Sequence, residues 1–120
     1  MRKRLAVICT LLSVSAWAAP QMRSLSLDDI RRVESLVKMP PGARSIESYN
    51  RFYAIKVENG REIIWGKFFP TTSDLPPPTV HIVAAEKMPA GIQDGGCLQV
   101  NLFYDVRDAK ITFIGCNGLT

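Results

Sequence analysis

Three cysteines and a single histidine are the residues of this chain that are best suited to chemistry. Cys97 follows two glycines in the stretch QDGGC, and Cys116 lies close to the C-terminus. A catalytic thiol would need a base such as His81 beside it and a lowered pKa. A zinc site built from these three residues lacks a fourth ligand and the closely spaced ligand pairs usual in zinc sites. Because neither of these sites is complete, a disulfide between Cys97 and Cys116 is the favoured interpretation.

The N-terminus supports the disulfide because it has the parts of a secretory signal peptide. Basic residues occupy positions 2–4, an apolar run covers 5–14, and Ser-Ala-Trp-Ala ends at Ala18. The apolar run has about ten residues, against roughly 20 for a membrane-spanning helix. We expect residues 1–18 to be cleaved, Cys9 with them; an uncleaved anchor is the alternative. In an oxidising compartment, two remaining cysteines usually form one disulfide.

Removal of the signal changes the charge balance. The chain has 15 basic and 11 acidic residues, and three of the basic ones lie in 1–18. Residues 19–120 therefore hold 12 basic and 11 acidic residues without a Lys/Arg run, which gives no electrostatic support for nucleic-acid binding. Residues 19–120 contain no apolar stretch of membrane length, so we expect no stable membrane insertion after signal removal. The predicted location is periplasmic or secreted, after a bacterial Sec-type signal.

The disulfide needs strands to position it, and the chain begins its folded part with a helix. We expect residues 19–25 to be a flexible N-terminus and 26–120 to be a single domain. The stretch SLDDIRRVESLVKMPPG predicts an amphipathic helix of about three turns, capped by Ser26 and ended by two prolines and Gly42. Its apolar stripe consists of Leu27, Ile30, Val33, Leu36 and Val37.

The rest of the chain reads as strands and loops. Asn59-Gly60 separates two β-rich runs and predicts a hairpin, in which Gly66 suggests a bulge. Three more strands are expected at TVHIVAAEKM, at CLQVNLFYD and at KITFIGC, and the loops 70–78 and 89–96 separate them. The predicted fold is α+β, with one N-terminal amphipathic helix packed on a four- to five-stranded antiparallel curved sheet and one disulfide.

The cysteines also predict a strand register. If Cys97 lies opposite Cys116 in an antiparallel hairpin, the large apolar residues of both strands sort onto one face. The expected pairs on this face are Leu98 with Gly115, Val100 with Phe113, and Leu102 with Ile111. A bridge at this position would close a loop of about 20 residues and contribute about 3 kcal/mol.

Two groups of residues are candidate sites. Tyr49, Arg51 and Tyr53 alternate along one strand, and this mix of residues is enriched at protein interfaces. The alternative is that the tyrosines belong to the core, with Arg51 at an edge. His81 lies between apolar neighbours, which is typical of a hydrogen-bonded structural histidine. As a general base it would need a carboxylate, such as Asp94 or Asp105, in a cavity between helix and sheet.

These observations predict a small exported, non-enzymatic protein-binding domain, such as an inhibitor or an envelope accessory protein. Its expected partner is another envelope or secreted protein, and the loops 70–78 and 89–96 are candidate docking edges. The alternative is a small enzyme or ligand-binding domain with a cavity that contains His81. A subunit that assembles through a strand edge is a third hypothesis. We expect no cofactor, because Gly95-Gly96 lacks the following helix and lysine of a phosphate loop, and no metal, because the zinc ligand set is incomplete.

Overall fold

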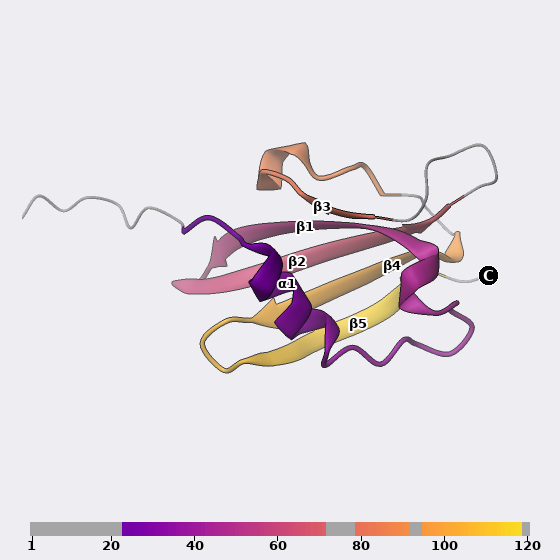
Figure 1. Ribbon diagram of the computed structural model, residues 1–120, viewed down its shortest axis with the longest axis horizontal. Helices are drawn as coiled ribbons and strands as arrows, with labels where there is room; N and C mark the ends of the chain where they lie inside the picture. Colours follow the sequence, from indigo (N-terminus) through magenta and orange to yellow (C-terminus); the bar gives the residue numbers. More distant parts are fainter. Residues whose placement is uncertain (1–22, 72–78, 92–94, 119–120) are drawn as a thin grey trace, which may run out of the picture.

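The computed structural model describes residues 23–71, 79–91 and 95–118, which form a five-stranded sheet with one α-helix (Figure 1). The order in the sheet is β3-β1-β2-β4-β5. The strands are β1 Tyr49–Glu58, β2 Arg61–Pro70, β3 Val80–Ile82, β4 Gly96–Asp105 and β5 Lys110–Asn117. The predicted signal peptide and most of the loop 70–78 lie outside the described residues.

The helix α1 (Leu27–Glu34) begins with a capping box. The Ser26 hydroxyl oxygen accepts from the backbone N–H of Asp29, and the Asp29 carboxylate accepts from the backbone N–H of Ser26 at 2.9 Å. The hydrogen bond from the Ser26 backbone N–H, with further ones from the Ser26 hydroxyl and Arg23, lowers the pKa of Asp29. With eight residues, α1 is shorter than the three turns expected, and Leu36 lies beyond its end, 48% exposed.

The hairpin predicted at Asn59-Gly60 is confirmed. Both residues have positive φ, 50° and 74°, as the tight turn requires, and every residue of β1 has a partner in β2. Gly66 pairs regularly with Tyr53, so the bulge suggested there is absent. The glycine has another role, since a Cβ at this position would lie 3.0 Å from the Tyr53 ring.

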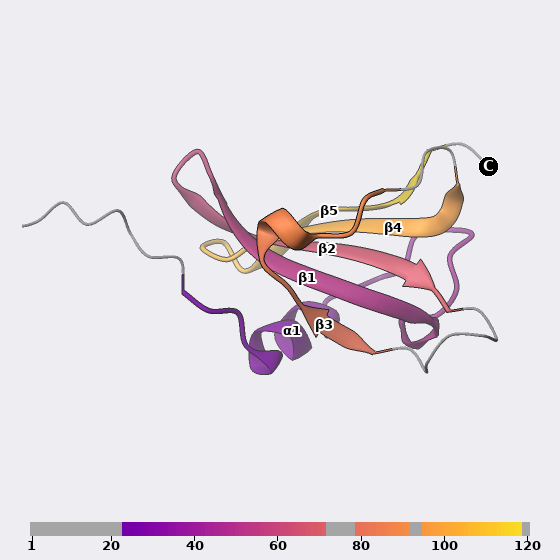
Figure 2. The same cartoon turned by 90° about the horizontal axis from the view of Figure 1, so that it is seen from above.

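The expectation of an all-antiparallel sheet was wrong, because β3 runs parallel to β1 (Figure 2). Tyr49 at the start of β1 pairs with Pro70 at the end of β2. The chain therefore leaves β2 at the end of the sheet where β1 starts. A strand that starts there and joins the open edge of β1 must run in the direction of β1, which makes the sheet mixed.

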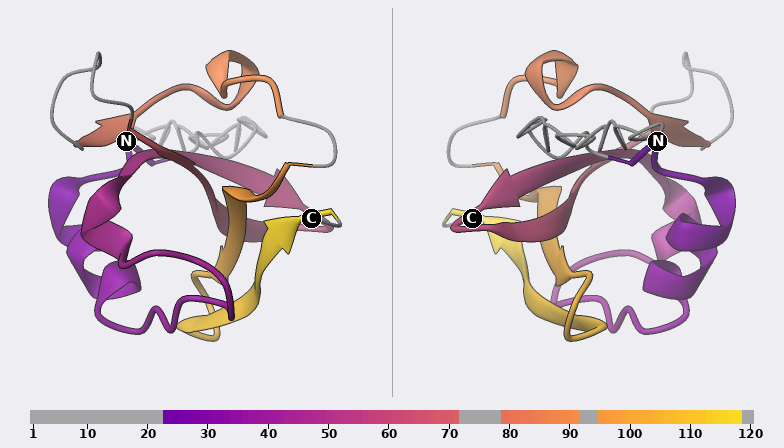
Figure 3. Two further views of the ribbon diagram at one scale, coloured as in Figure 1. Left: turned by 90° about the vertical axis from the view of Figure 1, so that its right-hand side faces the viewer. Right: turned by 90° about the vertical axis from the view of Figure 1, so that its left-hand side faces the viewer.

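The sheet is strongly curved, and α1 lies on its concave side (Figure 3). The core between them is formed by Ile30, Val33, Tyr49, Tyr53, Ile64, Phe68, Val100, Leu102 and Tyr104. The short 3-10 helix η1 (Ile46–Ser48) leads into β1, whereas η2 (Ala85–Lys87) lies outside the curve, beyond β1 (Figure 3). The side chains on the outer, convex face of the sheet therefore do not belong to this core.

The register predicted for the last hairpin holds only at its cysteine end. Gly96 pairs with Asn117, as the cysteines implied, but the next pair is Val100 with Cys116. Three residues of β4 bulge out between these pairs, which leaves Leu98 53% exposed. Beyond the bulge Leu102 faces Ile114 rather than Ile111, so the predicted register is wrong there.

Candidate binding site

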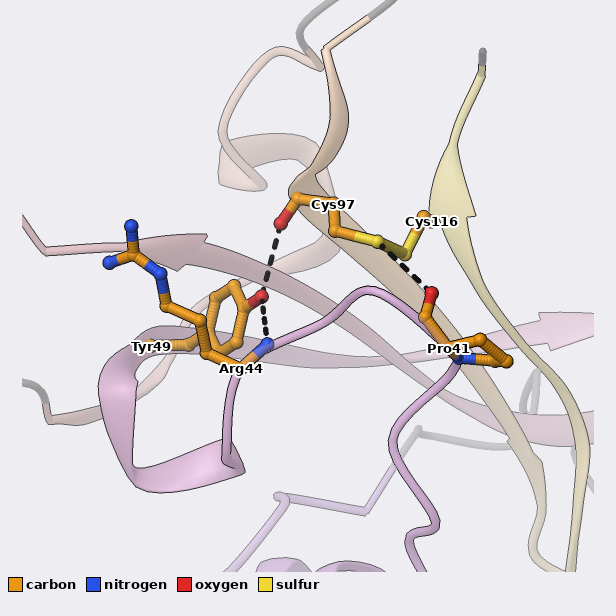
Figure 4. Close-up of a disulfide and its surroundings, with 5 residues drawn as sticks. All are labelled: Pro41, Arg44, Tyr49, Cys97 and Cys116. Carbon is orange, nitrogen blue, oxygen red and sulfur yellow. Dashed lines mark hydrogen bonds between the residues drawn. A yellow bond between two sulfur atoms is a disulfide. The ribbon is translucent and has the colours of Figure 1, made fainter. Parts of the chain in front are cut away.

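The disulfide between Cys97 and Cys116 is present, with an S–S distance of 2.01 Å and Cα atoms 4.6 Å apart. The Tyr49 hydroxyl donates to the Cys97 carbonyl oxygen and accepts from the Arg44 backbone N–H, both at 3.1 Å (Figure 4). The Pro41 carbonyl oxygen lies 3.6 Å from the Cys97 sulfur, which has no hydrogen to donate once it is bridged. The Tyr49 hydroxyl thus connects the segment before β1 to the last hairpin, next to the disulfide that joins β4 and β5.

The structure does not place Tyr49, Arg51 and Tyr53 on a surface. The two tyrosines are 1% and 0% exposed and belong to the core, and the Arg51 side chain is 12% exposed. This corrects the interface expected from their alternation. The concave side of β1 is the side that α1 covers, so alternate residues facing that side are buried together.

The Arg51 side chain can be mostly buried because its guanidinium is paired with a carboxylate and with backbone carbonyls. Its guanidinium forms a two-point ion pair with Glu34, at 2.6 Å and 3.1 Å. It also donates to the backbone carbonyls of Ile46 and Tyr49. The Tyr53 hydroxyl donates to the same Glu34 carboxylate at 2.7 Å. Burial, with the carboxylate of Glu34 beside it, raises the pKa of Tyr53 well above its ordinary value.

The residues of β1 between these three face the opposite way and line a pocket on the outer face of the sheet. Its volume is about 420 Å³. It is lined by Asn50, Phe52, Phe69, Pro70, Thr79, His81, Pro89 and Ala90. We call it the His81 pocket. It lies on the face away from α1 and not between helix and sheet, which corrects the expected position of the cavity. The lining is mostly apolar, with three polar side chains.

His81 is held in a fixed position in this pocket. Its ring stacks on Phe52, with centroids 4.6 Å apart and planes 14° apart. Its Nε2 is 2.7 Å from the Thr79 hydroxyl. Of the carboxylates considered for it, Asp105 is buried in an ion pair with Arg61 at 2.9 Å, and Asp94 lies outside the described residues. No acidic side chain is among the described residues that line the pocket.

A second hollow, of about 490 Å³, lies further along the same outer face. Its lining is formed by Trp65, Lys67, Gly91, Gln99, Asn101, Phe103, Phe113 and Asn117. We call it the aromatic groove. Lys67 donates to the Pro89 carbonyl at 2.8 Å and so ties the segment between the two hollows to the sheet. Burial lowers the pKa of Lys67.

Sequence reasoning missed this groove, although the alternation of Trp65, Lys67 and Phe69 along β2 was a signal for it. The sequence alone does not assign the two faces of this strand, because the neighbouring residues Ile64 and Phe68 are also apolar. Both of the latter are buried, at 1% and 0% exposure, so β2 has a core face and an aromatic outer face. From the sequence alone, this pattern cannot be distinguished from that of a strand that is buried on both faces.

The described part of the chain contains no cluster of three or more His, Cys, Asp or Glu side chains that could hold a metal ion. In the same ranges, the structure has no helix of the length and apolarity needed to cross a membrane. Comparisons with protein-family models, with curated proteins and with solved structures found no match to this chain. The function of this chain is therefore inferred from the geometry of the site.

Proposed function

We propose that this chain is an exported, non-enzymatic binding domain whose binding site is the His81 pocket. The partner is another envelope or secreted protein, which inserts an apolar side chain into the pocket. The observation that carries the proposal is the apolar pocket itself, about 420 Å³ in volume, on a sheet face that the core does not use. The pattern of residues 1–18 and the disulfide support export.

The chemistry of the pocket supports binding. Phe52 and Phe69 pack edge to face at 6.0 Å and provide a rigid aromatic wall. Asn50, Thr79 and His81 contribute a few polar groups, which in binding sites fix the orientation of an apolar ligand. The pocket also borders β3, which is an edge strand, so a partner chain can approach it from the side.

The test is affinity capture from envelope extract with three baits, all with the disulfide intact. The baits are the unmodified protein, Phe69→Ser in the pocket, and Leu27→Ser as the matched control. Leu27 is 54% exposed on α1, on the other side of the sheet. We expect one protein to be captured in stoichiometric amount by the unmodified and control baits. Its recovery should fall at least roughly tenfold with Phe69→Ser. Equal recovery by all three baits would place the interface elsewhere.

A free small molecule is the second candidate ligand, because the volume lies within the roughly 300–1,000 Å³ usual for small-molecule sites. Its probe is the fluorescent dye 8-anilinonaphthalene-1-sulfonate. Saturable one-to-one binding by the folded protein, lost in Phe69→Ser, together with no captured protein, would favour this candidate. Circular dichroism of each variant checks that the loss is not due to unfolding.

A further inference from the structure

The strand β3 lies at the edge of the sheet beside β1, and it turns every second residue of its backbone toward β1 (Figure 2). The Thr79 carbonyl oxygen accepts from the Arg51 N–H, and the Val83 N–H donates to the Tyr53 carbonyl oxygen, both at 2.9 Å. His81 lies between these two residues in the middle of β3. Because parallel strands bond through alternate residues, the backbone groups of His81 face β1 as well.

The backbone groups of Val80 and Ile82 consequently point away from the sheet. The ladder with β1 leaves them without a partner, and no other residue in the described part of the chain forms a hydrogen bond with them. Each residue therefore offers one N–H donor and one C=O acceptor along the open edge. These groups recur every second residue, which is the spacing at which an extended chain presents its own backbone groups.

Space for side chains is present on both faces of this edge. His81 lies on the outer face, in the His81 pocket. Ile82 is in register with the core residue Tyr53 and therefore faces the side of α1. On that side lies a cleft of about 440 Å³, whose lining includes Leu25, Ile55 and Ile82. We call it the Ile82 cleft. Ile82 itself is 41% exposed.

The open edge and the two hollowed faces together select an extended segment as the occupant. Alternate side chains of a strand point to opposite faces of a sheet. A strand added beside β3 therefore turns one side chain toward the His81 pocket and the next toward the Ile82 cleft. A helix laid on the outer face satisfies its own backbone internally, so it would leave Val80 and Ile82 unpaired. Strand addition to an open edge is an established mode of peptide recognition.

A second copy of this chain fits the edge less well. In a symmetric pair each copy would offer its own β3, and the outer-face residue of that strand is His81. The ring of His81 is stacked on Phe52 at 4.6 Å, and its Nε2 is 2.7 Å from the Thr79 hydroxyl of the same molecule. It is therefore not available to enter the pocket of the other copy.

We propose that the partner protein adds an extended segment to β3, as a sixth strand of the five-stranded sheet. The backbone of this segment pairs with Val80 and Ile82. An apolar side chain on its outer face lies next to His81 and enters the His81 pocket. This inference rests on the function proposed above, because it describes how the same partner is held at the same site.

Amide hydrogen exchange, followed by nuclear magnetic resonance, tests the open edge in the free protein. The Ile82 N–H should exchange at least roughly tenfold faster than the N–H of its neighbour Val83, which donates to Tyr53. Equal exchange at the two positions would show that the edge is already covered. That result would overturn strand addition without affecting the His81 pocket.

The variant Ile82→Pro removes the outward N–H and leaves the hydrogen bonds to β1 in place. Proline is tolerated in an edge strand where its nitrogen faces solvent. Ile82→Ala is the matched control, because it loses the same side chain and keeps the N–H. The protein captured in the test above is purified and titrated against both variants. Its affinity for Ile82→Pro should be at least roughly tenfold lower than for Ile82→Ala.

Exchange in the complex is a second measurement that does not depend on the folding of a variant. Binding of the captured protein should slow the exchange of the Ile82 N–H at least roughly tenfold. Strand addition alone is overturned if this amide stays unprotected, or if folded Ile82→Pro binds as well as Ile82→Ala, while Phe69→Ser still loses the partner. Both proposals are overturned if no protein is captured or if Phe69→Ser captures it equally. A dimer of this chain alone that protects the Ile82 N–H would overturn strand addition in favour of a second copy.

Discussion

Arg51 of β1 and Glu34 at the end of α1 form a two-point ion pair, with Nε–Oε2 at 2.6 Å and Nη2–Oε1 at 3.1 Å. The side chains are only 12% and 19% exposed. Because Tyr53 donates to the same carboxylate, one acidic group connects the helix to two residues of β1. This contact explains why a residue mix that is common at interfaces is buried here.

Replacement of Glu34 by alanine should destabilise the fold strongly. It leaves the Arg51 guanidinium and the Tyr53 hydroxyl without their acceptor in a mostly buried position. The expected loss in the free energy of unfolding is about 3 kcal/mol, measured by urea denaturation.

Asp28→Ala is the matched control for this variant. Asp28 pairs with Arg31 at 3.0 Å, but both side chains are more than three-quarters exposed, at 83% and 77%. Exposed pairs contribute little, so the control should lose less than about 0.5 kcal/mol. Equal losses in the two variants would show that the buried network does not hold α1 to the sheet.

Gly66→Ala should also destabilise the protein, although alanine is normally tolerated in a strand. The added Cβ would lie 3.0 Å from the Tyr53 ring and 3.2 Å from the Phe68 ring, both in the core. Overpacking of this kind costs about 1–3 kcal/mol. A double-mutant cycle with Tyr53→Leu checks the cause, since the alanine should cost clearly less once the tyrosine ring is gone.

Removal of the disulfide by Cys97→Ala with Cys116→Ala should lower the free energy of unfolding by about 3 kcal/mol. The bridge joins residues 19 positions apart and restricts the unfolded chain. Chemical denaturation with and without reductant gives the same quantity for the unmodified protein. As a control, iodoacetamide should label neither Cys97 nor Cys116 in the native, unreduced protein; rapid labelling of Cys97 would be inconsistent with the bridge.

Stability should fall in alkali because of Tyr53. In the unfolded chain its hydroxyl ionises near the ordinary pKa of 10.0, whereas burial and Glu34 raise the pKa in the folded state. Above pH 10 the unfolded state therefore loses a proton that the folded state keeps, and the free energy of unfolding decreases. Below pH 10 the full contribution of Tyr53 is present.

The variant Tyr53→Phe isolates this effect. It should be less stable than the parent at pH 7, because the hydrogen bond to Glu34 is lost. The difference between parent and variant should shrink by up to about 1.4 kcal/mol per pH unit above pH 10. A difference that stays constant from pH 8 to pH 11 would mean that Tyr53 ionises in the folded protein as it does in the unfolded chain.

Local signals in the sequence determined several features of this protein. The turn at Asn59-Gly60, the cap at Ser26 and the pairing of the two cysteines each depend on residues close together in the chain or on the number of cysteines available. The physics of these features is local: positive φ in a tight turn, satisfaction of the first helical N–H groups, and the redox chemistry of two thiols. They were therefore predictable without tertiary structure.

Only the tertiary structure decided what the faces of the sheet do. Alternation put Tyr49, Arg51 and Tyr53 on one side of a strand, but which side α1 covers depends on the curvature of the sheet and on the ion pair to Glu34. The parallel pairing of β3 and the bulge at Cys97 likewise result from strand contacts between distant segments. Both hollows lie on the outer face because burial and exposure along a strand are assigned by its neighbours, and its own residue pattern leaves the two faces interchangeable.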